Sequence, residues 1–260
     1  MQTETVKFVD VTEIFGQKVS SEQLLRTCNR YYWAESFVSG KRVLEVACGS
    51  GPGLGYLQKR AAQLEAGDIS PEVLEYARAT YDNKISLKVF DATCLPYDCN
   101  SFDVILLFEA LYYLGSADTF MAEARRVLRP GGWLLIATAN KDLFDFNPSP
   151  FSTTYHGVPE LAALCRAHGF DPHMSGFLDV SQVTLRQKLL RPVKKLAVAL
   201  NIMPKTMAGK AALKALAFGQ LVDMPASIVS TPHAFTPPTP VALDATDRRH
   251  KVIYCAAQRI

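Results

Sequence analysis

Glycine occupies every second position from Gly49 to Gly55, and an acid, Asp68, follows 19 residues after Gly49. Glycine allows positive φ angles and has no Cβ, so a ligand can lie directly against the backbone of such a turn. The apolar run 43–47 before the turn predicts a buried strand, and the helical pattern after it directs free N–H groups back at the turn. A second strand pattern ends at Gly67, so the Asp68 carboxylate can accept hydrogen bonds from both hydroxyls of a ribose. These features predict half of a doubly wound nucleotide-binding sheet.

The spacing of these glycines does not match the dinucleotide fingerprint G-x-G-x-x-G. In the three frames available, the third glycine is replaced by Leu54, Tyr56 or Gln58, which argues against a nicotinamide-dependent oxidoreductase. The chain instead has the pattern E-x-x-C-G-x-G-x-G from Glu45 to Gly53. This pattern resembles motif I of the class I S-adenosylmethionine-dependent methyltransferases.

Three later segments resemble the same family, in the family's order: D-A-x-x-L-P from Asp91, S-F-D-V from Ser101 and V-L-R-P-G-G from Val127. The resemblance implies that S-adenosylmethionine is the cofactor. It also implies that Asp91 accepts a hydrogen bond from the adenine amino group and that the Ala92 amide meets the ring. The alternative for Asp91 is a loop turn residue, and the V-L-R-P-G-G segment is expected to be structural.

An R-Y-x-x-A segment before motif I is also similar to the family, in which it roofs the cofactor pocket. This predicts that Arg30, Tyr31 and Trp33 lie over the cofactor, and the alternative is an aromatic helix face packed on the sheet. In total, the resemblance predicts ten cofactor-binding residues: Tyr31, Glu45, Ala47, Gly49, Gly51, Asp68, Ile69, Asp91, Ala92 and Phe108.

Strand and helix patterns alternate along the chain, which indicates an α/β fold with right-handed crossovers. We expect a doubly wound, Rossmann-like, seven-stranded sheet whose last strand is antiparallel, as in the family. The expected strands are 43–47, a segment ending at 67, 85–90, 104–108, 133–139, 171–177 and 250–257, and the expected helices are 54–62, one that starts after Ser70, 117–128 and 159–168. The predicted organisation is an N-terminal helical cap (1–40), a core (41–178 and 250–260) and an insertion (179–249).

The insertion has an unusual charge distribution, because residues 181–222 contain eight basic residues and no acidic one. We expect helices over 185–200 and 206–221 and an extended Pro-rich strap over 225–240. Such a segment could form a lid over an acidic substrate, could rest on an anionic membrane surface as a peripheral contact, or could be a solvated face.

The catalytic candidates follow the expected strands 104–108 and 133–139. Ligands in this kind of fold bind outside the carboxyl ends of the strands. Glu109 is therefore the first candidate for a general base, followed by Tyr155 and His156, and Tyr112 and Tyr113 are expected to face the acceptor. The alternative for Glu109 is a helix cap or a partner of the cofactor's amine. Five scattered histidines predict no metal site.

Composition narrows the class of protein further. A hydrophobic fraction of 48% is ample for a core, and a net charge of +3 does not call for a nucleic-acid partner. Six cysteines without a C-x-x-C pair predict free thiols in a reducing compartment. We expect no signal peptide and no membrane span, because no apolar run approaches 18 residues, and we therefore expect a cytoplasmic protein.

The leading hypothesis is methyl transfer to O or N, with C as an alternative, of a small molecule in natural-product, sugar or lipid biosynthesis. One alternative is a non-catalytic adenosyl-binding module. A nucleic-acid methyltransferase is another, although Phe108–Leu111 shows no N/D-P-P-Y-like tetrad.

Overall fold

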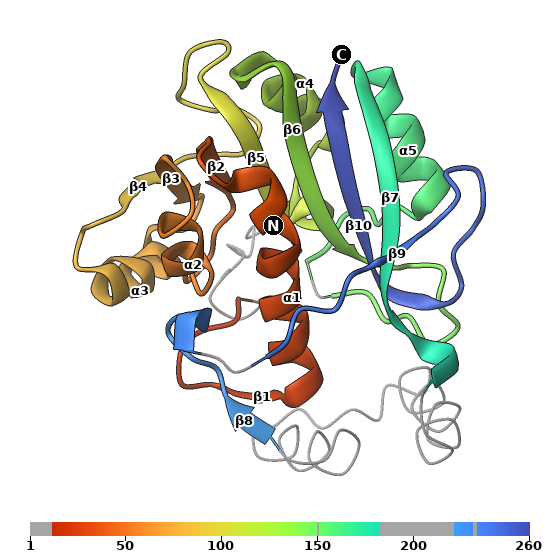
Figure 1. Cartoon of the computed structure of the whole chain (residues 1–260), viewed down its shortest axis with the longest axis horizontal. Coiled ribbons are helices and arrows are strands. Elements are labelled where there is room, and N and C mark those ends of the chain that lie inside the picture. Colours follow the sequence, from red (N-terminus) through yellow and green to blue (C-terminus); the bar gives the residue numbers. More distant parts are fainter. Residues whose placement is uncertain (1–11, 150, 183–220, 231–232) are drawn as a thin grey trace, which may run out of the picture.

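A computed structural model describes residues 12–149, 151–182, 221–230 and 233–260 of the chain. A single eight-stranded sheet forms the centre, in the order β4-β3-β2-β5-β6-β10-β7-β9 (Figure 1). The first five strands in this order are parallel, and β10 runs antiparallel between β6 and β7. The strands in spatial order are β4 Ser86–Val89, β3 Gln63–Asp68, β2 Arg42–Val46, β5 Phe102–Phe108, β6 Leu128–Ala139, β10 His250–Arg259, β7 Phe170–Asp179 and β9 Thr239–Pro240.

The seven expected strands are all present, and the antiparallel position of the last one beside β6 is confirmed. The two-residue strand β9, which pairs with the edge of β7, was not expected. Two boundaries also differ. The helix expected over 54–62 stops at Gln58, because Ala62 N–H already donates to Lys41 O and leads the chain into β3. The R-P-G-G segment lies inside β6, which starts at Leu128 with a shift in register.

In the described part of the chain, five α-helices cover the sheet: α1 Ser21–Val38, α2 Leu54–Gln58, α3 Pro71–Tyr81, α4 Ala117–Val127 and α5 Val158–Ala167. Hydroxyl caps begin three of them, since Ser20, Ser70 and Ser116 each accept a hydrogen bond from the N–H three residues later. Helix α1 lies on one face of the sheet, and α4 and α5 lie on the other (Figure 1). Strand β5 is buried on both faces, because Leu106 packs with the α1 layer and Leu107 with the α4–α5 layer.

The described part of the insertion returns to the N-terminal part of the chain. Strand β8 (Leu221–Asp223) pairs antiparallel with β1 (Lys18–Ser20), a pairing that the sequence did not predict. The strap expected over 225–240 is not extended throughout, since Ile228–Ser230 form a 3₁₀ turn whose first residue is buried. The predicted helix 185–200, and all of 206–221 except its last residue, lie outside the described residues. That the segment 179–249 forms a lid over the substrate stays a prediction.

Candidate functional site

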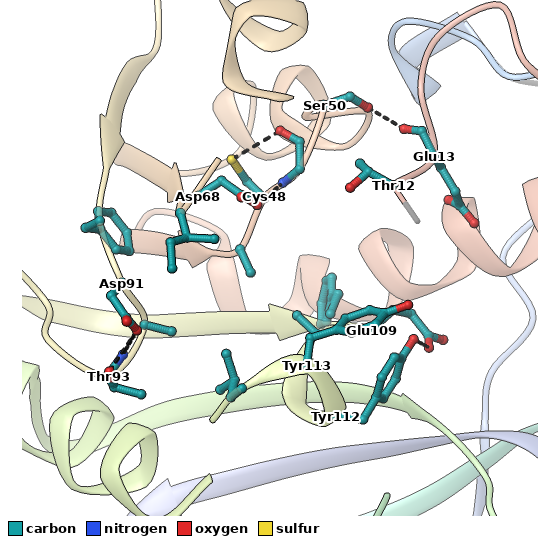
Figure 2. Close-up of a pocket in the computed structure, with 18 of the residues that line it drawn as sticks. Thr12, Glu13, Cys48, Ser50, Asp68, Asp91, Thr93, Glu109, Tyr112 and Tyr113 are labelled. Atoms are coloured by element: carbon teal, nitrogen blue, oxygen red, sulfur yellow. Dashed lines mark hydrogen bonds between the residues drawn. The ribbon is translucent and has the colours of Figure 1, made fainter. Parts of the chain in front are cut away.

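A cavity of about 450 Å³ lies at the carboxyl ends of the parallel strands. Figure 2 shows Asp68 and Asp91 on one side of it and Glu109, Tyr112 and Tyr113 on another. Seven of the ten predicted cofactor-binding residues line this cavity: Ala47, Gly49, Asp68, Ile69, Asp91, Ala92 and Phe108.

The Gly49 turn and the Asp68 carboxylate are joined directly. Gly49 has a φ of +58°, and its N–H donates to Asp68 Oδ2 at 2.9 Å, while Ser70 N–H donates to Oδ1 at 2.9 Å. Burial raises the pKa of Asp68, and the backbone N–H groups of Ser70 and Gly49 act against that shift. The Ile69 N–H is a third backbone donor to this carboxylate, and the four lone-pair positions of its two oxygens leave at least one for a ligand hydroxyl. Asp68 can therefore shape the turn and hold a ribose at the same time.

The other three predicted cofactor residues, Tyr31, Glu45 and Gly51, do not line the cavity. The Tyr31 ring fills the space beside Gly53, where a Cβ would lie 2.0 Å from it, and its hydroxyl donates to Glu45 Oε1 at 2.6 Å. Glu45 is 2% exposed, and its Oε2 has no hydrogen-bond partner in the described structure. Burial raises the pKa of Glu45 to about 7, although Tyr31 and a nearby arginine oppose this. Tyr31 thus packs against the glycine turn outside the cavity, and Glu45 accepts the hydrogen bond of its hydroxyl.

The side of the cavity after β4 carries Phe90, Asp91, Ala92 and Thr93. Asp91 Oδ1 accepts from Thr93 N–H and from the Thr93 hydroxyl, both at 2.8 Å. Asp91 is therefore a turn residue and also a cavity residue, with its second oxygen available on the exposed side. Its hydrogen bond to an adenine stays a prediction.

The opposite wall is built by Glu109, Tyr112 and Arg26. Glu109 follows β5 with a φ of +54°, and its Oε1 accepts from Arg26 Nη2 at 2.9 Å. Its Oε2 accepts from the Tyr112 hydroxyl at 3.0 Å. Burial acts to lower the pKa of Arg26, but the charge and hydrogen bond of Glu109 prevail and raise it. Burial, with the Glu109 charge, raises the pKa of Tyr112 well above its ordinary value. Glu109 is thus held by a charged donor and a neutral donor.

Arg30 lies one helical turn after Arg26 and also lines the cavity. Its side chain is 11% exposed, its nearest carboxylate is Glu13 at 3.9 Å, and its buried Nε has no hydrogen-bond partner in the described structure. Glu13 itself accepts from the Thr27 hydroxyl at 3.0 Å. Trp33, in contrast, does not line the cavity and stacks on Tyr254 at 4.7 Å between ring centroids. Of the residues predicted to roof the pocket, Arg30 thus lies at the cavity and Trp33 lies in the core.

Tyr155 and His156, two of the candidate bases, do not line the cavity. The Tyr155 ring stacks on Tyr112 at 4.3 Å between ring centroids, and its hydroxyl accepts from Ser149 N–H at 3.0 Å. His156 is half-buried, and burial lowers its pKa. Tyr155 thus lies behind Tyr112 and His156 lies outside the lining, whereas Glu109 lines the cavity.

Sequence reasoning did not identify several of the residues around the cavity. Arg26 could have been found, because it lies four residues before Arg30 and therefore on the same face of the helix. Glu13, in contrast, lies in a loop that shows no motif, and Ser50 Oγ donates to its backbone oxygen at 2.6 Å. Other lining residues not identified in this way are Thr12, Thr27, Phe90, Thr93, Ala110, Leu114, Gly115, Ser116 and Thr119.

The described residues contain no cluster of three or more His, Cys, Asp or Glu side chains that could hold a metal ion. None of their helices is both long and apolar enough to cross a membrane. A cytoplasmic location and a peripheral membrane contact stay predictions.

Comparison with known proteins agrees with this geometry. Residues 44–136 match a family model described as a methyltransferase domain. A phthiotriol/phenolphthiotriol dimycocerosates methyltransferase of Mycobacterium ulcerans is 37% identical over 45% of this chain and 45% of its own length. A fatty-acid O-methyltransferase of Mycolicibacterium smegmatis is 37% identical over 41% and 40%. A malonyl-[acyl-carrier protein] O-methyltransferase of Hahella chejuensis is 33% identical over 57% and 54%. The chain thus spans about half or less of the length of these relatives.

Solved structures share the fold at low sequence identity. A methyltransferase structure from Thermotoga maritima matches with a TM-score of 0.59 and 14% identity, covering 92% of each chain. One from Archaeoglobus fulgidus matches with a TM-score of 0.57 and 13% identity, covering 92% of this chain and 95% of its own. The [4+2]-cyclase SpnF matches with a TM-score of 0.58 and 19% identity, covering 96% and 87%.

The parallel sheet, the glycine turn and the acids at the ends of adjacent strands define a nucleoside-binding protein with a Rossmann-like fold. The family match and the relatives make the class specific. The match over residues 44–136 and the named relatives support a class I S-adenosylmethionine-dependent methyltransferase, with S-adenosylmethionine as its cofactor.

Proposed function

We propose that this protein transfers a methyl group from S-adenosylmethionine to oxygen or nitrogen, with carbon as an alternative, of a small-molecule or lipid-like acceptor. The observation that carries the proposal is the two-sided cavity. One side, with Asp68 and Asp91, suits a nucleoside, and the other side, with Glu109 and Tyr112, leaves room for a second molecule. The named acceptors of the relatives, phthiotriol lipids and a fatty acid among them, support an acceptor of this kind.

The cavity residues fit the cofactor group by group. Asp68 keeps at least one free acceptor position, which we assign to a ribose hydroxyl of the cofactor. Ile69 and Ala92 offer an apolar slot for a planar base, beside the second oxygen of Asp91. The Glu13 carboxylate lies 3.9 Å from Arg30, farther than an ordinary hydrogen bond, so we assign Arg30 to the methionine carboxylate of the cofactor.

When bound, S-adenosylmethionine supplies a methyl group on a positively charged sulfur. This charge disperses during transfer, so alignment of the acceptor with the methyl group can provide much of the catalysis. The protein's contribution is to bind both molecules, exclude water and orient the acceptor against the wall of Glu109 and Tyr112. A base is required only where the acceptor must lose a proton, and Glu109 is the candidate in the cavity for that role.

Titration calorimetry followed by a turnover assay tests the proposal. We expect micromolar binding of S-adenosylmethionine or its demethylated product and no binding of nicotinamide dinucleotides. We also expect demethylated cofactor to accumulate with a hydroxyl-bearing or amine-bearing lipid. Preference for a dinucleotide would refute the proposal. Cofactor binding without demethylated product across an acceptor panel would favour a non-catalytic adenosyl-binding module, or another reaction on this fold, as the name of the [4+2]-cyclase SpnF illustrates.

A further inference from the structure

Glu109 is immobilised at the wall where an acceptor would lie. Its two oxygens accept hydrogen bonds from Arg26 at 2.9 Å and from Tyr112 at 3.0 Å. Its side chain is 17% exposed, so most of its hydration has been replaced by these two donors. A carboxylate oxygen has about two lone-pair positions, and one position on each oxygen of Glu109 therefore stays open toward the cavity.

The charges around the cavity are unbalanced. Among the described residues that line it, the cations are Arg26 and Arg30, against the four carboxylates of Glu13, Asp68, Asp91 and Glu109. Arg26 is already paired with Glu109, and the proposed function gives Arg30 to the cofactor. In the described part of the chain, no unpaired cation then remains on the wall of Glu109.

We infer that this wall is an acceptor subsite for a neutral hydroxyl group, of an alcohol or a phenol, and that it rejects a carboxylate. Arg26 is its positioning residue. A hydroxyl donates to a free lone pair of Glu109, whereas a carboxylate meets a like charge and finds no cation to compensate its desolvation. The inference rests on the proposed function and narrows its acceptor to a hydroxyl compound, so it separates this chain from the relative that is named for a fatty acid, which is a carboxylate.

The chemistry balances for such an acceptor. The hydroxyl oxygen gains the methyl carbon, and sulfur keeps the electron pair of the carbon–sulfur bond that breaks. The hydroxyl proton passes to Glu109 and from there to water. Arg26 does not touch the acceptor in this scheme, because its role is to hold the Glu109 carboxylate in place through the hydrogen bond to Oε1.

A matched pair of ligands tests the inference. The protein is first titrated with S-adenosylhomocysteine by calorimetry, and the saturated protein is then titrated with 4-butylphenol and, separately, with 4-butylbenzoate. We expect the phenol to bind at least tenfold more tightly. Glu109→Gln should bring the two affinities within about threefold, mainly because the benzoate gains. Glu75→Gln, an exposed carboxylate on α3, is the matched control and should keep the wild-type ratio.

The Arg26→Gln variant tests whether Arg26 positions the Glu109 carboxylate. The variant keeps the negative charge of Glu109 but frees the carboxylate, so we expect the phenol affinity to fall and the benzoate to stay weak. Equal binding of both ligands to the wild type, a ratio that Glu109→Gln does not change, or binding of neither ligand would overturn the inference. Failure of S-adenosylhomocysteine to bind in the first titration would instead refute the proposed function.

Discussion

Replacement of Asp68 by Asn provides a sharp test of the cofactor site. Asn keeps the shape of the side chain, but only one of its two terminal atoms can accept a hydrogen bond. In the structure the two oxygens of Asp68 face Gly49 N–H and Ser70 N–H, each at 2.9 Å. The amide group of Asn must therefore place its NH₂ against one of these N–H groups and against one ribose hydroxyl.

The magnitude follows from the bonds that are lost. A hydrogen bond to a charged group contributes about 1.5–3 kcal/mol. Loss of one such bond to the ribose, with a weaker second bond, corresponds to about 1.5–4 kcal/mol. Because 1.4 kcal/mol is a factor of ten, Kd for S-adenosylmethionine should rise roughly 10-fold to 1,000-fold. Calorimetry measures Kd, and thermal unfolding without cofactor measures the stability of the fold.

Ser70→Ala is the control for the local structure. Ser70 Oγ caps α3 by accepting from Val73 N–H at 3.3 Å, and its loss should reduce stability by about 0.5–2 kcal/mol. The Ser70 backbone N–H remains, so Kd should stay within about twofold. The wild-type affinity should also fall as the pH drops through the raised pKa of Asp68, because a protonated oxygen no longer accepts. An Asp68→Asn protein with wild-type Kd would show that the acid only shapes the turn, and the reasoning about ribose would be wrong.

Two further predictions concern residues outside the cavity. Glu45→Gln should become increasingly more stable than the wild type as the pH rises from 5 to 8. In the folded wild type the pKa of Glu45 is raised from 4.5 to about 7. Ionisation of Glu45 therefore lowers the stability of the wild type by about 3 kcal/mol as the pH rises through this range, whereas Gln does not ionise. Thermal unfolding at both pH values measures this, and a pH-independent difference would contradict it. Ile228 is fully buried, and its N–H donates to Pro52 O at 2.9 Å, so Ile228→Ala should cost about 2–4 kcal/mol of stability and loosen the glycine turn. Calorimetry of Ile228→Ala should show a weaker cofactor affinity. Met174→Ala, in the other core layer, is the control and should lose stability with Kd unchanged. An equal rise of Kd in both variants would refute the link between Ile228 and the glycine turn.

The sequence by itself determined the sheet, the glycine turn and the acid at the end of β3. These features depend on patterns within short segments: apolar runs, the hydroxyl caps before α1 and α3, and glycine at a positive φ. Parallel strands place their carboxyl ends at one edge, so Asp68 and Gly49 meet although 19 residues separate them. The physical reason is that the conformation of each short segment, together with the order of the strands, leaves few ways to arrange the sheet and the turns at its edge.

Tertiary structure alone decided which residues form the Glu109 wall of the cavity and which residues pack against the glycine turn. Arg26 meets Glu109 across 83 residues because α1 packs on the sheet beside β5, and no local pattern encodes this packing. The same packing puts the Tyr31 ring against Gly53 and buries Glu45 below the cavity. The return of β8 onto β1 also depends on a pairing between segments some 200 residues apart. Contacts of this range depend on how complete layers pack, so only the folded chain shows which side chains share the cavity.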